Sequence, residues 1–212
     1  MKLYNYYLSS ASFRVRIALN LKGLDWEYVG RHLRNKEHRA PDYLALNPQG
    51  FVPALVTDQG DVLLQSVAIM EWLEDTHPTP ALLPTDALGR ARVRAITQLI
   101  ACDIHPLNNL RVLQYLVGPL KLDEEAKNGW YRHWVTEGFE ALEKMLANDP
   151  ATGRFCHGDQ PTMADCCLVP QIFNAKRFDV DLTPYPTIRR ILDACMALPA
   201  FDKAQPSNCP ET

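Results

Sequence analysis

The sequence has no apolar run close to the roughly 20 residues that a membrane-spanning helix needs. Its first residues, MKLYNYYLSSASFRVRIAL, contain no apolar signal core followed by a small-residue cleavage site, and two arginines interrupt them. The six cysteines include no Cys-x-x-Cys pair and no pairing of close cysteines with close histidines. These absences predict a cytoplasmic protein with no membrane partner, no disulfides, no metal site and no thioredoxin-like redox chemistry.

An excess of basic charge is missing as well. The 212 residues carry 22 Lys and Arg against 25 Asp and Glu, a net charge of −3. Nucleic-acid-binding domains are usually strongly basic, so we expect no nucleic-acid partner. Hydrophobic residues make up 47% of the chain and charged residues 22%, which is near the globular average. The sequence is therefore that of a globular protein with enough apolar mass for a core.

Short apolar runs alternate with helical patterns in the first eighty residues. Strands are predicted at 2–7, 26–29, 52–56 and 62–64. Helices are predicted after Ser9-Ser10, around 36–46 and from Gln65-Ser66 onward. The resulting order, β-α-β-α-β-β-α, describes a small sheet packed with helices.

The pattern changes after the segment 76–84, which carries three prolines and which we interpret as an interdomain linker. Long helical stretches follow at 87–118, 123–147, 162–178 and 184–197, without strand-like alternation. Thr162 and Asp165 have the spacing of a capping box, with Asp in place of the usual Glu. The sequence thus predicts an α+β domain at 1–80 and an all-helical domain at 86–212.

Three positions in the first domain suit an anionic or peptide-like ligand. Ser9 and Ser10 stand where a strand runs into a helix, and unpaired N–H groups there stabilise an anion or a thiolate. Val52 precedes a proline, and a cis bond at that point would expose its N–H and C=O. Gln65 and Ser66 open a second helix, which suits a carboxylate. Taken singly, each serine is more simply explained as a helix N-cap.

Together these features resemble the N-terminal thioredoxin-like domain of glutathione transferases, and six segments narrow the resemblance to the zeta class. The segments are SSASFRVRIAL (9–19), ALNPQGFVPAL (45–55), LLPTD (82–86), DIHPLNNLRVL (103–113), TMADCCLVPQ (162–171) and RFDVDLTPYPTI (177–188). They occur in order and span nearly the whole chain. The resemblance implies the glutathione transferase fold, an α+β thioredoxin-like N-terminal domain followed by an all-α C-terminal domain, and a homodimer.

The resemblance also implies a site for glutathione as cofactor. Ser9 would donate a hydrogen bond to the glutathione sulfur and hold it as thiolate, with Ser10 in support. The backbone of Val52 would pair with the cysteinyl unit, and Gln65 and Ser66 would hold the γ-glutamyl end. The other positions that match glutathione-site residues of the class are His38, His105, Asn109, Leu110 and Arg111.

Arginines are expected to bind the carboxylates of a small keto-acid substrate. Arg177 matches an arginine that binds a substrate carboxylate in this class, and Arg14 and Arg111 are further candidates; Arg14 joins the two serines in the predicted catalytic set. Arg14 and Arg16 lie two residues apart on a helix, so at most one is expected to face the site. The simpler interpretations are that Arg14 and Arg16 are solvent-facing charges and that Arg177 is a charge that balances the helix dipole. Lys176 is the rival of Arg177, but an arginine fork suits a carboxylate better.

One departure from the class concerns the chemistry. Ala11 stands where the family usually has cysteine, so glutathione itself must carry the sulfur chemistry. The resemblance implies a cis–trans isomerase that converts maleylpyruvate to fumarylpyruvate by reversible thiolate addition to the double bond. Alternatives are maleylacetoacetate as substrate, or conjugation or dehalogenation of small α-haloacids. A transferase-like interaction module could dispense with Ser9, Gln65 and Ser66, so their joint presence argues against it.

Overall fold

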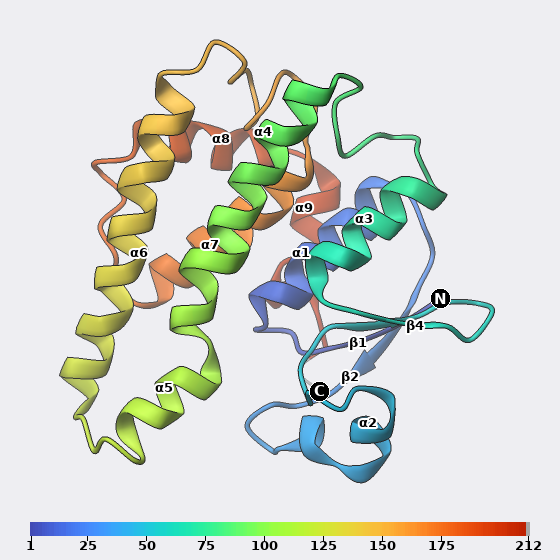
Figure 1. Cartoon of the computed structure of the whole chain (residues 1–212), viewed down its shortest axis with the longest axis vertical. Helices are drawn as coiled ribbons and strands as arrows, with labels where there is room; N and C mark the ends of the chain where they lie inside the picture. The colour runs from blue at the N-terminus through green and yellow to red at the C-terminus, as the bar shows by residue number, and fades with distance from the viewer. Residues whose placement is uncertain (211–212) are drawn as a thin grey trace. The chain divides into compact units, whose positions relative to one another are not determined.

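The computed structural model describes residues 1–210. Two compact units make up the chain: the first is Met1–Leu83 with the segment from Met196 onward, and the second is Pro84–Cys195 (Figure 1). These units are defined by packing, and they place the C-terminal segment with the first one. The domain limits drawn along the sequence, 1–80 and 86–212, stay a prediction. Within the described residues no helix is both long and apolar enough to cross a membrane.

A four-stranded mixed sheet with the order β2-β1-β3-β4 forms the centre of the first unit. The strands are β1 (Lys2–Asn5), β2 (Glu27–Gly30), β3 (Ala54–Val56) and β4 (Val62–Leu64). β1 runs parallel to β2 and antiparallel to β3, and β3 pairs antiparallel with β4. Leu3 is paired with Leu55, and both side chains are fully buried, so the middle of the sheet belongs to the core.

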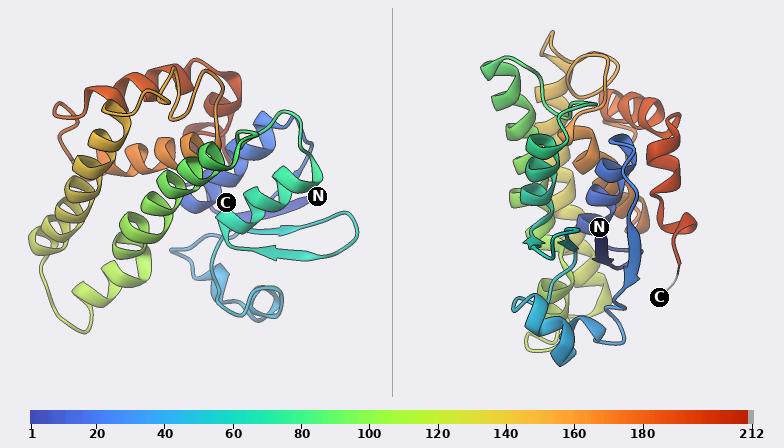
Figure 2. Two further views of the ribbon diagram at one scale, coloured as in Figure 1. Left: turned by 45° about the horizontal axis from the view of Figure 1, so that its top comes forward. Right: turned by 90° about the vertical axis from the view of Figure 1, so that its right-hand side faces the viewer.

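Helices cover both sides of this sheet (Figures 1 and 2). α1 (Ser10–Leu21) and α3 (Ser66–Thr76) pack against each other on one side, and the short α2 (Pro41–Leu46) lies on the other. α9 (Pro199–Lys203) packs on α1. α1 and α3 run in the same direction, so their first turns lie at one end of the unit (Figure 1). The predicted α+β domain is confirmed.

Three predicted elements of this unit have different limits in the structure. The strand predicted over 2–7 stops at Asn5, because the chain turns where Ser9 N donates to the carbonyl of Tyr6 at 2.9 Å. The helix predicted around 36–46 is divided into a 3₁₀ turn, η1 (Glu37–Arg39), and α2, since a residue that precedes a proline is pushed out of the helical region. The strand predicted over 52–56 begins only at residue 54, after a cis Val52–Pro53 bond.

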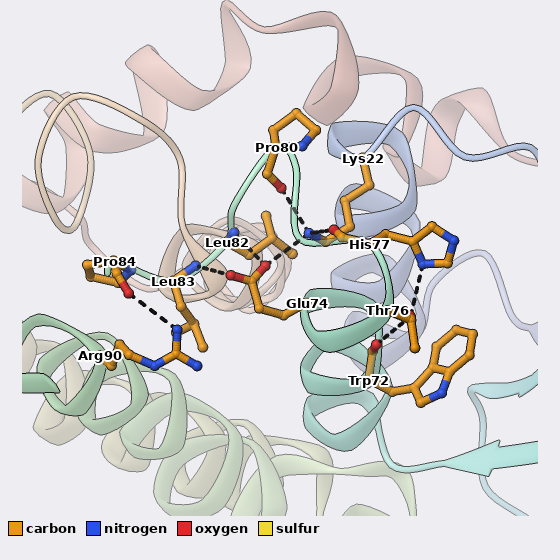
Figure 3. A network of polar contacts seen from close by, with 10 residues as sticks. All are labelled: Lys22, Trp72, Glu74, Thr76, His77, Pro80, Leu82, Leu83, Pro84 and Arg90. Atoms are coloured by element: carbon orange, nitrogen blue, oxygen red, sulfur yellow. Dashed lines mark hydrogen bonds and ion pairs between the residues drawn. The ribbon is translucent and has the colours of Figure 1, made fainter. Parts of the chain in front are cut away.

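A buried ion pair holds most of the segment interpreted as a linker in place within the first unit (Figure 3). Lys22, which caps the end of α1, places Nζ 2.9 Å from Oε2 of Glu74 in α3, and their side chains are only 0% and 7% exposed. Backbone groups complete the network: the carbonyls of His77 and Pro80 accept from Lys22, and the N–H groups of Leu82 and Leu83 donate to Glu74. The two buried charges thus hold residues 77–83 against the ends of both helices.

The second unit is all-helical, as predicted. Its helices are α4 (Ala87–Gln98), α5 (Leu110–Val117), α6 (Glu124–Ala147), α7 (Met163–Arg177) and α8 (Pro186–Met196), with a π-helical turn η2 (Leu99–Ile104) and a 3₁₀ turn η3 (His105–Asn108) between α4 and α5. Nearly all of the side chains of α7 are buried, and α4 packs along it. α7 is therefore the central helix of this unit.

The stretch predicted as helical over 87–118 is helical in the structure, but it is divided into four pieces: α4, η2, η3 and α5. Regular α-helix ends at Gln98, and Pro106 lies where a continued helix would need a backbone N–H and room for the preceding turn. Asn109 then starts α5 by capping it. At this irregular stretch Ile104 packs so close to α6 that a Cβ on Gly138 would lie 2.4 Å from the Ile104 side chain.

The predicted capping box at the start of α7 is present. Asp165 is fully buried, and its carboxylate accepts the N–H groups of Thr162 at 2.7 Å and of Cys156 at 2.9 Å. The box therefore holds the loop that precedes α7 against the helix. Cys166 and Cys167, which follow it, are 0% exposed, so the prediction that they are core residues is confirmed.

Candidate functional site

Ser9 occupies the head of α1. It is the N-cap residue, and its Oγ accepts the N–H of Ser12 at 3.2 Å. The N-cap interpretation and the functional one are compatible, because a serine hydroxyl accepts with its lone pairs and donates with its own proton. Ser9 uses its acceptor capacity on the helix and has a proton to donate at a helix end that favours negative charge.

Ser10 is the first residue of α1 and is 4% exposed, so it is packed into the unit rather than presented on its surface. Behind it, Arg16 fixes the loop that leads into the helix. The Arg16 guanidinium is fully buried and donates to Asn5 Oδ1 at 3.0 Å and to the carbonyls of Tyr7 at 3.0 Å and Ala204 at 3.0 Å. Arg16 is thus a structural residue that ties β1, the loop before Ser9 and the C-terminal segment together.

Arg14 joins the heads of the two helices. Its Nη1 donates to Oγ of Ser66 at 3.2 Å, and Ser66 is the first residue of α3. Arg14 is 2% exposed and Ser66 is 6% exposed, so the solvent-facing interpretation of Arg14 is wrong. Its Nε and Nη2 are inaccessible and have no hydrogen-bond partner among the described residues. A buried cation in this state is costly unless negative charge approaches it.

Gln65 precedes α3 with a strained backbone. Its φ of 69° and ψ of 119° fall in a region that residues other than glycine rarely adopt. Two hydrogen bonds hold it there: its carbonyl accepts the N–H of Ile69 at 2.9 Å, and its side-chain Nε2 donates to Oε1 of Gln49 at 2.9 Å. Such strain persists where the surrounding structure enforces it, which is typical of ligand-binding positions.

The loop before β3 leaves a pair of backbone groups unused. Neither the N–H nor the C=O of Val52 has a hydrogen-bond partner within residues 1–210. The loop is nevertheless rigidly anchored, because the Phe51 carbonyl accepts from Tyr43 Oη at 2.5 Å and from Asn47 Nδ2 at 2.8 Å. A fixed loop that presents one N–H and one C=O is suited to pairing with an extended peptide backbone.

His38 lies in η1 and is half-buried. Its Nδ1 is inaccessible and has no partner among the described residues. Burial, and after it the charge of Arg39, lowers the pKa of the His38 imidazole. At neutral pH the ring is therefore uncharged and can accept or donate one further hydrogen bond.

In the second unit four predicted residues follow one another around the start of α5. His105 is the first residue of η3, and Asn109 caps α5 by accepting the N–H of Val112 on its Oδ1 at 3.3 Å. Leu110, the first residue of α5, is 37% exposed, and Arg111 beside it is exposed as well. The structure thus gathers these residues at one helix head, with a cation in its first turn.

Arg177 is the last residue of α7 and is exposed, as is Lys176. Its guanidinium carbon lies 5.9 Å from the centre of the Phe173 ring, within the range of a cation–π contact. Next to it, Tyr131 and Phe178 stack with their ring centres 3.6 Å apart. The helix-dipole interpretation therefore fits the position of Arg177. The contact with Phe173 also fixes the side chain of Arg177, and among the described residues Lys176 has no such contact.

The cysteines offer little alternative chemistry. Burial raises the pKa of the Cys156 and Cys195 thiols well above their usual value, so both are protonated at neutral pH. Cys102 is exposed and lines a cavity of about 460 Å³ between η2 and α6, and none of the predicted site residues lines this cavity. Among the described residues no cluster of His, Cys, Asp or Glu could hold a metal ion.

Sequence reasoning missed the residues that hold the site residues in place. Gln49 fixes Gln65, Arg16 fixes the loop before Ser9, and Asn47 fixes the loop that carries Val52. Gln49 and Asn47 do stand in the NPQG turn, whose residue types indicate a tight turn but not its partners. For Arg16 the sequence gave only its position on the helix, two residues after Arg14.

Comparison with known protein families matches residues 8–76 to the glutathione S-transferase N-terminal domain and residues 129–197 to the glutathione S-transferase C-terminal domain. A maleylpyruvate isomerase from Ralstonia sp is 54% identical over 212 residues, which is the full length of both chains. The chain belongs to the glutathione S-transferase family.

Two solved structures narrow the family relationship. A maleylpyruvate isomerase described as a bacterial zeta-class glutathione S-transferase, in its holo form, has a TM-score of 0.97 at 54% identity, with 100% of both chains covered. A maleylacetoacetate isomerase from Methylobacterium extorquens AM1, with bound malonate and glutathione, has a TM-score of 0.96 at 42% identity over 99% of this chain and 98% of that one. The predicted membership of the zeta class and the predicted fold are confirmed.

Proposed function

We propose that the protein is a glutathione-dependent cis–trans isomerase that converts maleylpyruvate to fumarylpyruvate. The observation that carries the proposal is the pair of serines at the heads of α1 and α3. Ser9 accepts from Ser12, and Ser66 accepts from Arg14, so each hydroxyl has its proton left for a ligand. Full-length similarity to isomerases of this family supports the same activity.

The first unit fits glutathione by three independent features. The Val52 backbone offers an unused N–H and C=O to a peptide unit. The head of α3, with the strained Gln65 and the buried cation of Arg14, suits a carboxylate. The head of α1 suits a thiolate, because the helix dipole and the Ser9 hydroxyl both stabilise negative charge there.

On this fit, Ser9 holds the glutathione sulfur and Ser10 supports it through the same helix end. Val52 pairs with the cysteinyl unit, and Gln65 and Ser66 bind the γ-glutamyl end. When bound, glutathione supplies the thiol that adds to the double bond and leaves again, so that rotation can occur. The remaining proposed glutathione-site residues are His38, His105, Asn109, Leu110 and Arg111.

The protein must also bind two substrate carboxylates and stabilise the charge that develops on the keto group. We assign one carboxylate to Arg177, whose planar fork is suited to bidentate binding, and Arg111 is the second candidate cation. The burial of Arg14 gives no support to direct contact with the substrate. The substrate is thus expected to be a small dicarboxylate keto acid.

Ala11 and the buried cysteines bear on how the thiol is supplied. Ala11 lies in the first turn of α1, beside the two serines, and carries no reactive group. Cys156 and Cys195 are fully or nearly fully buried, with raised pKa values. The sulfur nucleophile is therefore glutathione, and the enzyme does not need a thiol of its own at the head of α1.

Maleylacetoacetate is the alternative substrate, because related structures carry both names. The two keto acids differ only in the tail beyond the maleyl group and both carry two carboxylates, so the preference for maleylpyruvate rests on the full-length relative of that name at 54% identity. A homodimer in the cytoplasm is the expected setting, by analogy with the class.

Steady-state rates on both substrates test the proposal. We expect isomerisation of maleylpyruvate to depend on glutathione, with a higher kcat/KM than for maleylacetoacetate and with the fumaryl product identified by NMR. A higher kcat/KM for maleylacetoacetate would transfer the assignment to that substrate. Accumulation of a glutathione conjugate without isomer would contradict the isomerase itself.

A further inference from the structure

Arg14 differs from the other buried arginine of α1 in that two of its guanidinium nitrogens have no hydrogen-bond partner among the described residues. It is 2% exposed, and its one side-chain hydrogen bond among the described residues runs from Nη1 to Ser66 Oγ at 3.2 Å. No carboxylate within residues 1–210 forms an ion pair with it, and its Nε and Nη2 are buried without partners. A buried guanidinium with unpaired nitrogens costs free energy, so its presence here points to a role in ligand binding.

Arg16, two residues further along the same helix, shows what a purely structural arginine looks like here. It is equally buried, but its Nε, Nη1 and Nη2 all donate, to the carbonyl of Ala204, to Asn5 and to the carbonyl of Tyr7. None of these partners belongs to α3. The two arginines therefore lie on the same helix and are similarly buried. Only Arg14 contacts the head of α3, and only Arg14 has guanidinium nitrogens without a partner among the described residues.

We propose that Arg14 is a positioning residue that makes the head of α3 select for a ligand carboxylate, acting through Ser66. The inference rests on the proposed function, in which Ser66 binds the γ-glutamyl end of glutathione. It adds a cause for that binding: the bond from Arg14 occupies a lone pair of Ser66 Oγ, so the Ser66 proton points away from Arg14 as a donor.

The charge of Arg14 acts in the same direction. It lies behind the first residue of α3, where the helix N-terminus already favours an anion. The low local dielectric strengthens this attraction, since Arg14 and Ser66 are both more than nine-tenths buried. Because its free nitrogens are inaccessible, Arg14 does not touch the ligand and is not itself a catalytic residue.

The test compares two ligands in calorimetric binding experiments. One is glutathione, and the other is 4-aminobutyryl-cysteinyl-glycine, which is glutathione without its α-carboxylate. We expect the wild-type protein to bind glutathione about ten- to a hundredfold more tightly, the range of one charge-assisted hydrogen bond. In Arg14→Met the preference should fall to about two- to fivefold, the share that a helix N-terminus alone supplies.

Two further variants separate this role from a merely structural one. Arg14→Lys keeps the charge and should recover part of the preference, and it serves as the test protein if Arg14→Met does not fold. Arg16→Lys is the matched control, and it should lower the melting temperature while the ratio of the two dissociation constants stays at the wild-type value. In a double-mutant cycle, Arg14→Met and Ser66→Ala should be strongly non-additive in that ratio.

The outcomes distinguish this inference from the proposed function. If the wild type binds neither ligand, the glutathione assignment fails and this inference with it. If the wild type prefers glutathione and the Arg14 variants weaken both ligands equally, Arg14 is only structural and the inference alone is overturned. Loss of the preference for glutathione in Arg14→Met, with partial recovery in Arg14→Lys, supports the inference.

Discussion

Replacement of Ser9 by alanine removes two interactions at once, and the structure allows them to be separated. The first is the N-cap bond from Ser12 N to Ser9 Oγ, and losing such a cap costs about 1 kcal/mol. For a chain of 212 residues this lowers the melting temperature by about 2–4 °C. The second is the hydrogen bond that Ser9 donates to the glutathione sulfur in the proposed function, and losing one such donor lowers turnover by about 10²–10³.

Matched variants assign each effect to its cause. Ser9→Gly loses the hydroxyl but only a few tenths of a kcal/mol of cap stability, so it should be slow yet almost as stable as wild type. Asp123 caps α6 by accepting the N–H of Ala126 at 2.8 Å, so Asp123→Ala should lower stability without changing turnover. Ser10→Ala should lower turnover less than Ser9→Ala.

The thiol pKa of bound glutathione is the most direct assay of this role. We follow the ultraviolet absorbance of the thiolate against pH in the binary complex. The thiol should titrate at higher pH in Ser9→Ala than in wild type, because the hydrogen bond that stabilises the thiolate is lost. Turnover should fall in proportion to the lost thiolate at neutral pH. Wild-type turnover in both Ser9→Ala and Ser9→Gly would refute the reasoning and leave the sulfur to backbone N–H groups.

Three further predictions concern other parts of the chain. Glu74→Ala leaves Lys22 buried without its partner, so it should destabilise the fold by about 3–5 kcal/mol and lower the melting temperature by about 6–20 °C. Glu27→Ala, at an exposed ion pair, should have little effect, and equally small shifts in both variants would mean that the buried pair does not stabilise the fold. Gln65→Gly relieves a positive φ but loses the side chain, so we expect an unchanged or higher melting temperature together with a higher KM for glutathione, and an unchanged KM would remove Gln65 from the site. Arg177→Ala should lower kcat/KM for the maleyl substrate by about ten- to a hundredfold with glutathione binding intact, and an equally small effect from Lys176→Ala would show that neither residue binds the substrate.

The elements that the sequence predicts well are those governed by local patterns. Helical periodicity located α1, α3, α6 and α7, and the spacing of Thr162 and Asp165 predicted the capping box. The stretch predicted as helical over 87–118 is helical, but the sequence did not indicate that a π turn, a proline and a new cap at Asn109 divide it. A periodicity count does not register such interruptions when the apolar side chains still face one core.

Contacts between residues far apart in the sequence were beyond prediction. Nothing in the order of residues indicates that Arg14 reaches Ser66, 52 positions later, or that Lys22 pairs with Glu74. The sequence favours Arg14 over Arg16 for the site because Arg14 is closer to the helix N-terminus, but it does not show that both are buried or which partners they have. The serines were located by the helix starts, but their donor role depends on contacts that only the folded chain supplies.

The central claim is that glutathione takes part in the reaction and is returned unchanged. Its most direct test follows maleylpyruvate, fumarylpyruvate and free glutathione together by NMR, with substrate in large excess over glutathione. We predict complete conversion to the fumaryl isomer, many turnovers per glutathione molecule, a constant glutathione concentration and no conversion when glutathione is left out. Consumption of one glutathione per product, or isomerisation at the same rate without it, would contradict the account.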